Sequence, residues 1–240
     1  MSVRLDRLLA NLGYGSRREV QNLIARGGVA LDGVKLRDPS AHVAANPDIP
    51  ERMTVSGARV DPPTPLTLVL NKPLGVVCSH REAGRSVYEL LPERWRRRTP
   101  VLSTIGRLDA DTSGLLLLTD DGDLLHRVIS PRRHVRKTYL ATLERDLSGD
   151  EGPIFASGSL MLEGETKPLA PAILEPVTPR TARLTVTEGR YHQVRRMFAA
   201  TTNQVMALHR ESIGALVLPA DLDAGVWRIA TAEDIALVFA

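Results

Sequence analysis

A proline-rich segment at residues 61–65, with the sequence DPPTP, separates a short N-terminal part of the chain from a longer C-terminal part. Proline fixes φ and lacks an amide hydrogen, so such a run favours an extended, semi-rigid connection. A chain of 240 residues can hold one large hydrophobic core or two modest ones. We therefore expect a small module over residues 1–60, a linker over 61–65 and a larger domain over 66–240.

The N-terminal part has the pattern of two short helices followed by a β-hairpin. Leucines at positions 5, 8, 9 and 12 lie on one helical stripe. Ser16 and Glu19 have the spacing of a capping box, which predicts a second helix that ends at the glycines at positions 27 and 28. Asp32-Gly33 lies between two apolar triplets and predicts a two-residue hairpin turn.

Basic residues gather in this part of the chain, because residues 1–37 contain seven Lys or Arg and three Asp or Glu. Arg17 and Arg18 start the second expected helix, and Lys35 and Arg37 follow in the hairpin, so we expect one basic surface. The opening RLD, the helix start SR and the hairpin VALDG make the module similar to the alpha-L RNA-binding module, named after a small-subunit ribosomal protein. The resemblance implies that Arg17 and Arg18 contact RNA. A small α+β domain of no particular function stays open as an alternative.

Beyond the linker, short apolar runs alternate with loops. This mixture of strands and helices predicts an α+β domain around a mixed, largely antiparallel sheet. The expected strands are 66–71, 76–78, 115–118, 137–143, 172–175, 183–186 and 205–209, and the expected helices are 85–91, 151–156, 192–200 and 232–239, the last capped by Thr231.

Composition excludes several classes of protein. Cys78 is the single cysteine, so a disulfide framework or a thiolate zinc cluster is excluded, and the six histidines lack ligand spacing. We expect neither metal nor cofactor. The N-terminus carries charges within its first seven residues, at Arg4, Asp6 and Arg7, and no apolar run reaches signal or membrane length, so we expect a cytoplasmic protein without membrane contact. Net charge is only +3, but basic runs at 94–98 and 127–137 favour an anionic partner.

The segment 106–119, GRLDADTSGLLLLT, carries the clearest signal for chemistry. Arg107 and Asp109 are two residues apart, so on an extended segment their side chains lean to the same side. A polar turn follows, and then four leucines that are typical of a buried strand. This order places one carboxylate at the edge of a hydrophobic core.

Three other interpretations of this segment remain. It can be a simple polar turn. Asp109, Asp111, Ser113, Gly114 and Asp120 also match positions of a calcium-binding loop, although position 12 should be glutamate and the flanks resemble strands. A glycosidase-like pair of Asp109 with Asp111 or Asp120 is the third interpretation.

The segment resembles the catalytic motif of the pseudouridine synthases, which runs Gly-Arg-Leu-Asp, two variable residues, then Thr-Ser/Thr-Gly-Leu. Every fixed position is matched. Four further segments follow the family pattern in the expected order: the turn NKPLG at 71–75, the strand KTY at 137–139, the segment EGRYHQVRRM at 188–197 and the tripeptide LHR at 208–210. The resemblance covers nearly the whole chain.

The resemblance implies roles for individual residues. Asp109 is the essential catalytic residue, acting as a nucleophile or as a base, and Arg195 pairs with it and keeps it ionised. Tyr139 packs against the target base, and Leu208 lies beneath that base. Arg107 fills the gap that the extruded uridine leaves in the RNA.

Lys72, in the first motif, is a further expected substrate-binding residue. The strand and turn around it also account for that motif, and we consider this structural role the better explanation. No redox step or metal is required by the isomerisation that the family catalyses.

Within the family, the motifs favour the branch that modifies one uridine of small-subunit ribosomal RNA, the RsuA type. We expect a monomer that acts on 16S RNA in a pre-ribosomal particle, at uridine 516. Two alternatives remain: a synthase acting on 23S RNA, and a non-catalytic RNA-binding factor in ribosome assembly.

Overall fold

The computed structural model describes residues 2–79 and 83–240, which form two compact units. The first unit comprises the N-terminal segment up to Thr67 together with Leu91–Ser103 and Thr119–Gly122. The remaining residues form the second unit. Two segments of the larger expected domain therefore pack with the N-terminal module. No helix among the described residues is long and apolar enough to span a lipid bilayer.

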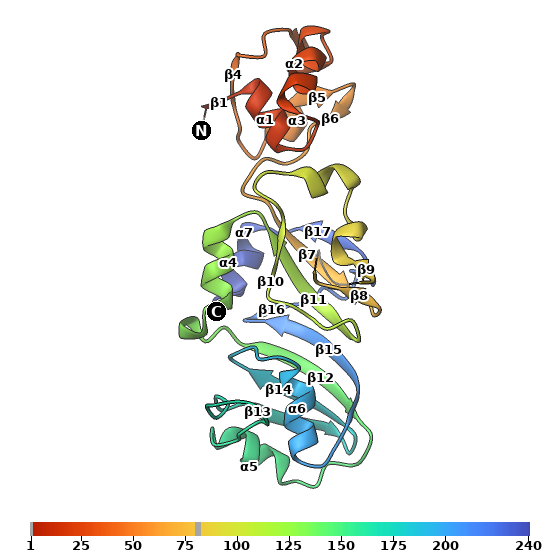
Figure 1. The fold of residues 1–240 in the computed structure, drawn as a ribbon, viewed down its shortest axis with the longest axis vertical. Coiled ribbons are helices and arrows are strands. Elements are labelled where there is room, and N and C mark those ends of the chain that lie inside the picture. Colours follow the sequence, from red (N-terminus) through yellow and green to blue (C-terminus); the bar gives the residue numbers. More distant parts are fainter. Residues whose placement is uncertain (1, 80–82) are drawn as a thin grey trace. The chain divides into compact units, whose positions relative to one another are not determined.

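The first unit contains short helices and strands around its own hydrophobic core (Figure 1). Its core is lined by the helical leucine stripe at positions 5, 8, 9 and 12, as the sequence predicts. Its elements are β1 (Ser2–Arg4), α1 (Leu5–Asn11), α2 (Arg17–Ala25), β2 (Val29–Leu31), β3 (Val34–Leu36), β4 (His42–Ala44), α3 (Ile49–Arg52), β5 (Met53–Val55), β6 (Ala58–Arg59) and the 3-10 helix Glu93–Arg97.

Two local predictions for this unit are confirmed. The Ser16 hydroxyl accepts a hydrogen bond from the backbone amide of Glu19, and the Glu19 carboxylate accepts one from the amide of Ser16, which completes the capping box of α2. Asp32 and Gly33 both have positive φ, +50° and +80°, as a two-residue turn between β2 and β3 requires.

The basic run at 94–98 is partly internal to the first unit, so the expectation of an anionic partner does not hold for all of it. Arg94 makes a two-point ion pair with Asp61, at 2.6 and 2.7 Å, and stacks over the Tyr14 ring. The side chain of Arg98 is only 1% exposed and pairs with the buried Asp120 at 3.0 Å. These contacts also bind the proline-rich segment into the unit, since Arg98 donates to the carbonyl of Pro62.

The second unit is built on a nine-stranded sheet in which antiparallel pairs dominate. The strand order is β13-β14-β12-β15-β11-β7-β17, with β10 beside β11 and β16 beside β15. The strands are β7 (Thr67–Lys72), β10 (Ser103–Ile105), β11 (Thr112–Thr119), β12 (Lys137–Leu143), β13 (Ile173–Thr178), β14 (Thr181–Val186), β15 (Val205–Ile213), β16 (Leu216–Val217) and β17 (Trp227–Ile229). A separate pair joins β8 (Val76–Val77) to β9 (Arg85–Ser86).

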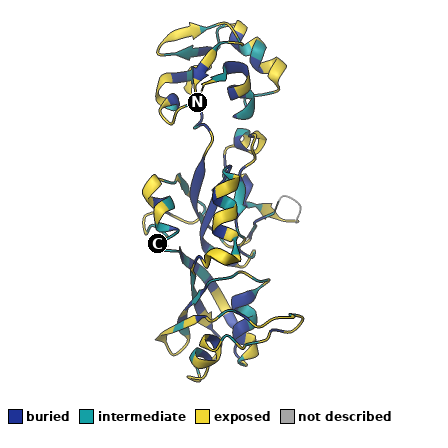
Figure 2. Ribbon diagram, turned by 90° about the vertical axis from the view of Figure 1, so that its left-hand side faces the viewer, coloured by how far each residue is buried: buried dark blue, intermediate teal, exposed yellow. Residues whose placement is uncertain are grey.

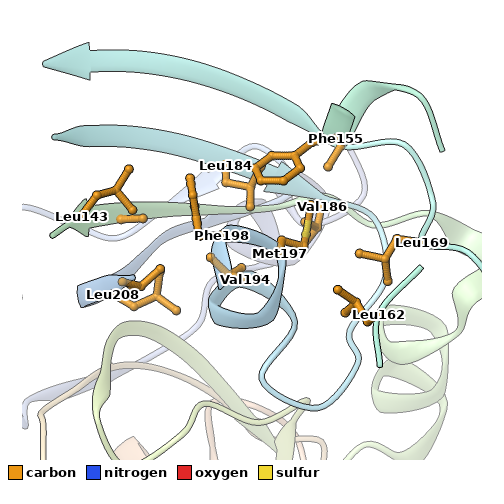
Figure 3. Close-up of a cluster of buried hydrophobic side chains, with 13 residues drawn as sticks. Leu143, Phe155, Leu162, Leu169, Leu184, Val186, Val194, Met197, Phe198 and Leu208 are labelled. Atoms are coloured by element: carbon orange, nitrogen blue, oxygen red, sulfur yellow. The ribbon is translucent and has the colours of Figure 1, made fainter. Parts of the chain in front are cut away.

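Four helices pack on this sheet, in two groups (Figure 1). The helices are α4 (Gly122–Ile129), α5 (Glu151–Ala156), α6 (Gln193–Ala200) and α7 (Ala232–Leu237), with 3-10 turns at Val87–Leu90 and Pro131–Arg133. α4 and α7 share a core with β7, β11 and β15, whereas α5 and α6 cover β12 and β14. Figure 3 shows the second core, where Phe155 and Phe198 meet edge to face with centroids 5.3 Å apart.

Two helix predictions differ from the structure. The segment 85–91 was expected to be a helix, but it begins as strand β9 and continues as a 3-10 turn, because residues 85 and 86 pair with β8. Helix α4 was not predicted. The strand expected at 115–118 extends over Thr112–Thr119 as β11, whose residues are buried except Ser113 (Figure 2).

Candidate active site

Asp109 lies in the loop between β10 and β11, and glycines shape this loop at both ends. Gly106 begins it with φ of +72°, a conformation that glycine adopts without strain. Gly114 pairs with Arg210 of β15, and a Cβ at this position would lie 2.3 Å from the Arg210 carbonyl oxygen. The glycine therefore lets β11 approach β15 closely, which fixes where the strand begins and where the loop ends.

The turn after β7 holds the same loop from another side. The amide of Gly75 donates to the carbonyl of Ala110 at 2.7 Å. The ammonium group of Lys72 donates to the carbonyls of Thr112 and Pro73, at 2.8 and 3.0 Å. Two residues of the NKPLG turn thus hold the backbone immediately after Asp109, at residues 110 and 112.

Lys72 is fully buried, with 0% of its surface exposed, so its ammonium group offers no surface to a substrate in this structure. The expected direct contact with substrate is thus replaced by a structural contact with the loop. Burial lowers the pKa of Lys72, while the nearby Cys78, Asp109 and Asp111 act in the opposite direction. The buried cation therefore lies close enough to Asp109 to influence the loop carboxylates electrostatically.

The Asp109 side chain is 34% exposed, and it lies beside a histidine rather than beside the expected arginine. Nε2 of His192 lies 3.4 Å from Oδ1 of Asp109. His192 precedes helix α6 with φ of +48°, an uncommon conformation for a residue with a side chain. The sequence reasoning did not single out His192, although it lies inside the matched segment 188–197.

Arg195 pairs with Asp111, so the expected ion pair between Arg195 and Asp109 is absent from the structure. Nη2 of Arg195 is 2.9 Å from the Asp111 carboxylate and 3.0 Å from its carbonyl oxygen, and Nη1 donates to the carbonyl of Val205 at 2.9 Å. The guanidinium thus bridges α6, the start of β15 and the end of the loop that carries Asp109. Its geometric effect on Asp109 is indirect, through the backbone that the two aspartates share.

Tyr139 of β12 is half-buried and held by a buried arginine. Nη1 of Arg210 donates to the Tyr139 hydroxyl at 3.3 Å, and Nε of Arg210 donates to the carbonyl of Leu115 at 2.7 Å. Arg210 therefore links the tyrosine to β11. Leu208, two residues earlier on β15, is buried in the core that α6 covers and pairs in register with Thr112 (Figure 3).

The other expected RNA-binding residues lie on surfaces. Arg107 is exposed on the loop that carries Asp109. In the first unit, Arg18 is exposed, and Arg17 reaches Asp6 at 3.2 Å while remaining largely exposed. Hydrogen bonds from Arg4, Gln21 and Arg17 hold the pKa of the buried Asp6 well below its usual range.

Arg17 and Arg18 lie at the opposite end of α2 from Arg37. Arg37 donates to the carbonyl of Ala25 at the C-terminal end of α2, whereas Arg17 and Arg18 lie at its start. The expected single basic surface is thus spread along the helix.

A cavity of about 480 Å³ adjoins the site where α6 meets β15. Its lining contains three cationic side chains, Arg145, Arg195 and Arg196, together with His192 and the acidic Glu144. Such a hollow next to Asp109 suits an anionic ligand better than an apolar one.

The alternative interpretations of segment 106–119 lack structural support. Residues 113–119 belong to strand β11, so they cannot close a twelve-residue calcium loop. No cluster of three His, Cys, Asp or Glu residues suited to a metal occurs in the described part of the chain. Asp111 and Asp120 are each engaged by an arginine, which does not favour either of them as the second carboxylate of a glycosidase-like pair.

Comparison with known proteins identifies the family of each part of the chain. The family model described as RNA pseudouridylate synthase matches residues 66–200, and the model described as S4 domain matches residues 3–48. A crystal structure of a pseudouridylate synthase, 34% identical, superposes with a TM-score of 0.69 and covers 98% of this chain and 99% of that one.

Several curated relatives match over nearly the whole chain. Ribosomal small subunit pseudouridine synthase A of Escherichia coli strain K12 is 41% identical over 240 residues, covering 98% of this chain and all of that protein. The enzyme of the same name from Pseudomonas aeruginosa is 40% identical, with 98% and 100% coverage. An uncharacterized RNA pseudouridine synthase of Bacillus subtilis is also 40% identical, with 98% coverage of each chain.

Both units therefore have an assigned class. The fold and the match to the family define an enzyme that isomerises uridine in RNA. The chain belongs to the RNA pseudouridylate synthase family and carries an N-terminal S4 RNA-binding domain. The expected α+β fold, the resemblance to the pseudouridine synthases and the alpha-L module are thus confirmed.

Proposed function

We propose that this enzyme converts one uridine of small-subunit ribosomal RNA to pseudouridine, with Asp109 as the reacting carboxylate. The observation that carries the proposal is the position of Asp109: it is one-third exposed on a loop that Lys72, Gly75 and Arg195 hold in place. The names of the relatives from Escherichia coli and Pseudomonas aeruginosa support the choice of RNA. We assign uridine 516 of the 16S RNA as the target.

The reaction breaks the bond between N1 of uracil and C1′ of ribose and forms a bond between C5 and C1′. The proton on C5 is lost and N1 ends protonated, so the product is an isomer of the substrate. An ionised Asp109 suits two routes: attack as a nucleophile, or removal of a proton from the sugar. Both routes need an accessible carboxylate in a fixed position, and the hydrogen bonds to the loop backbone hold Asp109 there.

The surrounding residues receive roles that follow from their contacts. The half-buried Tyr139 would face the extruded base, and Leu208 would form the apolar floor. Arg107, exposed on the loop, would enter the RNA where the base has left the stack. Arg195 becomes a positioning residue that fixes the end of the loop through Asp111.

The N-terminal module would hold the RNA rather than take part in the reaction. We assign residues 1–60 to RNA binding, with Arg17 and Arg18 facing phosphates, 61–65 to the linker and 66–240 to catalysis. The orientation of Arg17 by the buried Asp6 supports this role. We further propose that a single cytoplasmic copy acts on a pre-ribosomal particle.

The test is pseudouridine mapping of ribosomal RNA from cells with and without the protein. We expect one small-subunit site to disappear without the protein and to return with the wild-type chain but not with Asp109→Asn. Loss of a 23S site instead would overturn the substrate. An unchanged map combined with RNA binding in vitro would indicate a non-catalytic assembly factor.

A further inference from the structure

Tyr191 presents an aromatic ring to solvent beside the catalytic carboxylate. It is 75% exposed, the largest fraction among the exposed large hydrophobic side chains of the described residues. One face of its ring stacks on the imidazole of His192, with centroids 3.9 Å apart and ring planes 16° from parallel. His192 in turn contacts Asp109, so Tyr191 is linked to the carboxylate through His192. The other face of the Tyr191 ring is free.

The backbone that carries this ring is held on both sides. Arg190 and Arg196 flank the stacked pair, and both ion-pair with Glu165, at 3.1 and 3.0 Å. Arg196 also donates to the carbonyl of Tyr191 at 3.2 Å, and Arg190 donates to the carbonyl of Lys167 at 2.8 Å. An exposed ring on a fixed backbone loses little freedom when a flat ligand stacks on it.

The geometry points to Tyr191 as a stacking subsite for a nucleobase adjacent to the target uridine. Every nucleobase has a π-face, and aromatic side chains bind unpaired bases by stacking on it. The Tyr191 ring separates a base on its free face from His192, the residue that contacts Asp109, so this position is distinct from that of the reacting base. The cationic cavity beyond His192 offers a path for the phosphates of the same strand.

This subsite rests on the proposed function, because it assumes an RNA whose target uridine enters beside Asp109. It extends that function to the stacking of a neighbouring nucleobase, a role that is assigned to no other residue above. Tyr139 supports the reacting base, whereas Tyr191 would hold the RNA strand that leads to it. Loss of Tyr191 should therefore weaken binding more than it slows the reaction of bound RNA.

The binding test uses Asp109→Asn protein, so that the RNA stays unmodified, and a fragment of small-subunit RNA around the mapped uridine. 2-Aminopurine replaces one base at a time on either side of the target. We expect its fluorescence to be quenched at one position, equally with Tyr191 and with Tyr191→Phe, which keeps the ring. Tyr191→Ala should lose the quenching and bind about 5- to 150-fold more weakly.

An abasic nucleotide at the quenched position completes the cycle. It should weaken binding of the wild-type ring by the same factor, with no further loss in Tyr191→Ala. In active protein, Tyr191→Ala should raise KM more than it lowers kcat, with an unchanged thermal midpoint because the side chain is exposed. Equal binding by Tyr191→Ala and Tyr191→Phe, or additive losses in the cycle, would overturn the subsite. If wild-type protein, with Asp109 intact, does not modify small-subunit RNA, the proposed function is overturned instead.

Discussion

Breaking the buried ion pair between Arg98 and Asp120 should strongly destabilise the first unit. Both side chains are inaccessible, at 1% and 0% exposure, and their nearest charged atoms are 3.0 Å apart. Asp120 also accepts hydrogen bonds from the amide of Leu66 at 2.7 Å and from the Thr64 hydroxyl at 3.0 Å. Arg98→Met would leave this carboxylate buried without its cation, at a cost of about 3–5 kcal/mol.

The neighbouring Arg97 is a matched control. It is 68% exposed and pairs with Glu93, four residues earlier, at 3.0 Å. Exposed pairs with this spacing are worth about 0.3–0.5 kcal/mol. Arg97→Met removes the same charge one residue away, so any effect of net charge on the unit is common to both variants.

The assay is urea unfolding followed by tryptophan fluorescence. Each unit contains one tryptophan, Trp95 in the first and Trp227 in the second, so a Trp227→Phe background reports the first unit alone. With a denaturant slope of about 1–3 kcal/mol per molar urea, Arg98→Met should lower the midpoint by at least about 1 M. Adding Asp120→Asn should recover part of the loss, because no buried charge then remains unpaired. Equal midpoints for Arg98→Met and Arg97→Met would refute the reasoning.

Three further predictions concern the second unit. Arg228 holds the pKa of Asp234 at about 2, so this carboxylate should contribute about 2 kcal/mol of stability above pH 4. This contribution is lost as the pH falls towards 2. Acid unfolding followed at Trp227 should show the loss in wild type and not in Asp234→Asn. Gly114→Ala should cost at least about 2 kcal/mol in thermal unfolding, because φ is +106° and the new Cβ meets the Arg210 carbonyl; a wild-type midpoint would contradict the close approach. Tyr139→Phe keeps the ring but loses the hydrogen bond from Arg210, so single-turnover rates should fall about fivefold. An unchanged rate would show that the Tyr139 hydroxyl does not contribute to the reaction.

The sequence predicted best where the signal was local. The capping boxes of α2 and α7 each need two side chains three residues apart, and both form. The hairpin at Asp32-Gly33 depends on a conformation that these two residues favour by themselves. The prediction of a helix at 85–91 was wrong because residues 85 and 86 pair with strand β8. The residue pattern within the segment does not show that pairing.

The candidate site was harder to predict, because it depends on which side chains meet in space. A motif gives the residue type of Arg195 but cannot tell Asp109 from Asp111 as its partner, since both lie on one short loop. Lys72 carries a charge that suggests RNA contact, yet it is buried against backbone carbonyls. His192 was missed because its position within the segment 188–197 gives no sign that its ring lies beside Asp109.

The central claim, that Asp109 performs the isomerisation, has a direct measurement. Bond formation at C5 releases the hydrogen of that carbon, so small-subunit RNA carrying tritium at C5 of uridine loses label to water as product forms. We predict release of one tritium per modified RNA with wild-type enzyme and none with Asp109→Asn, at protein concentrations where both bind the RNA equally. Release by Asp109→Asn within tenfold of the wild-type rate would contradict the account.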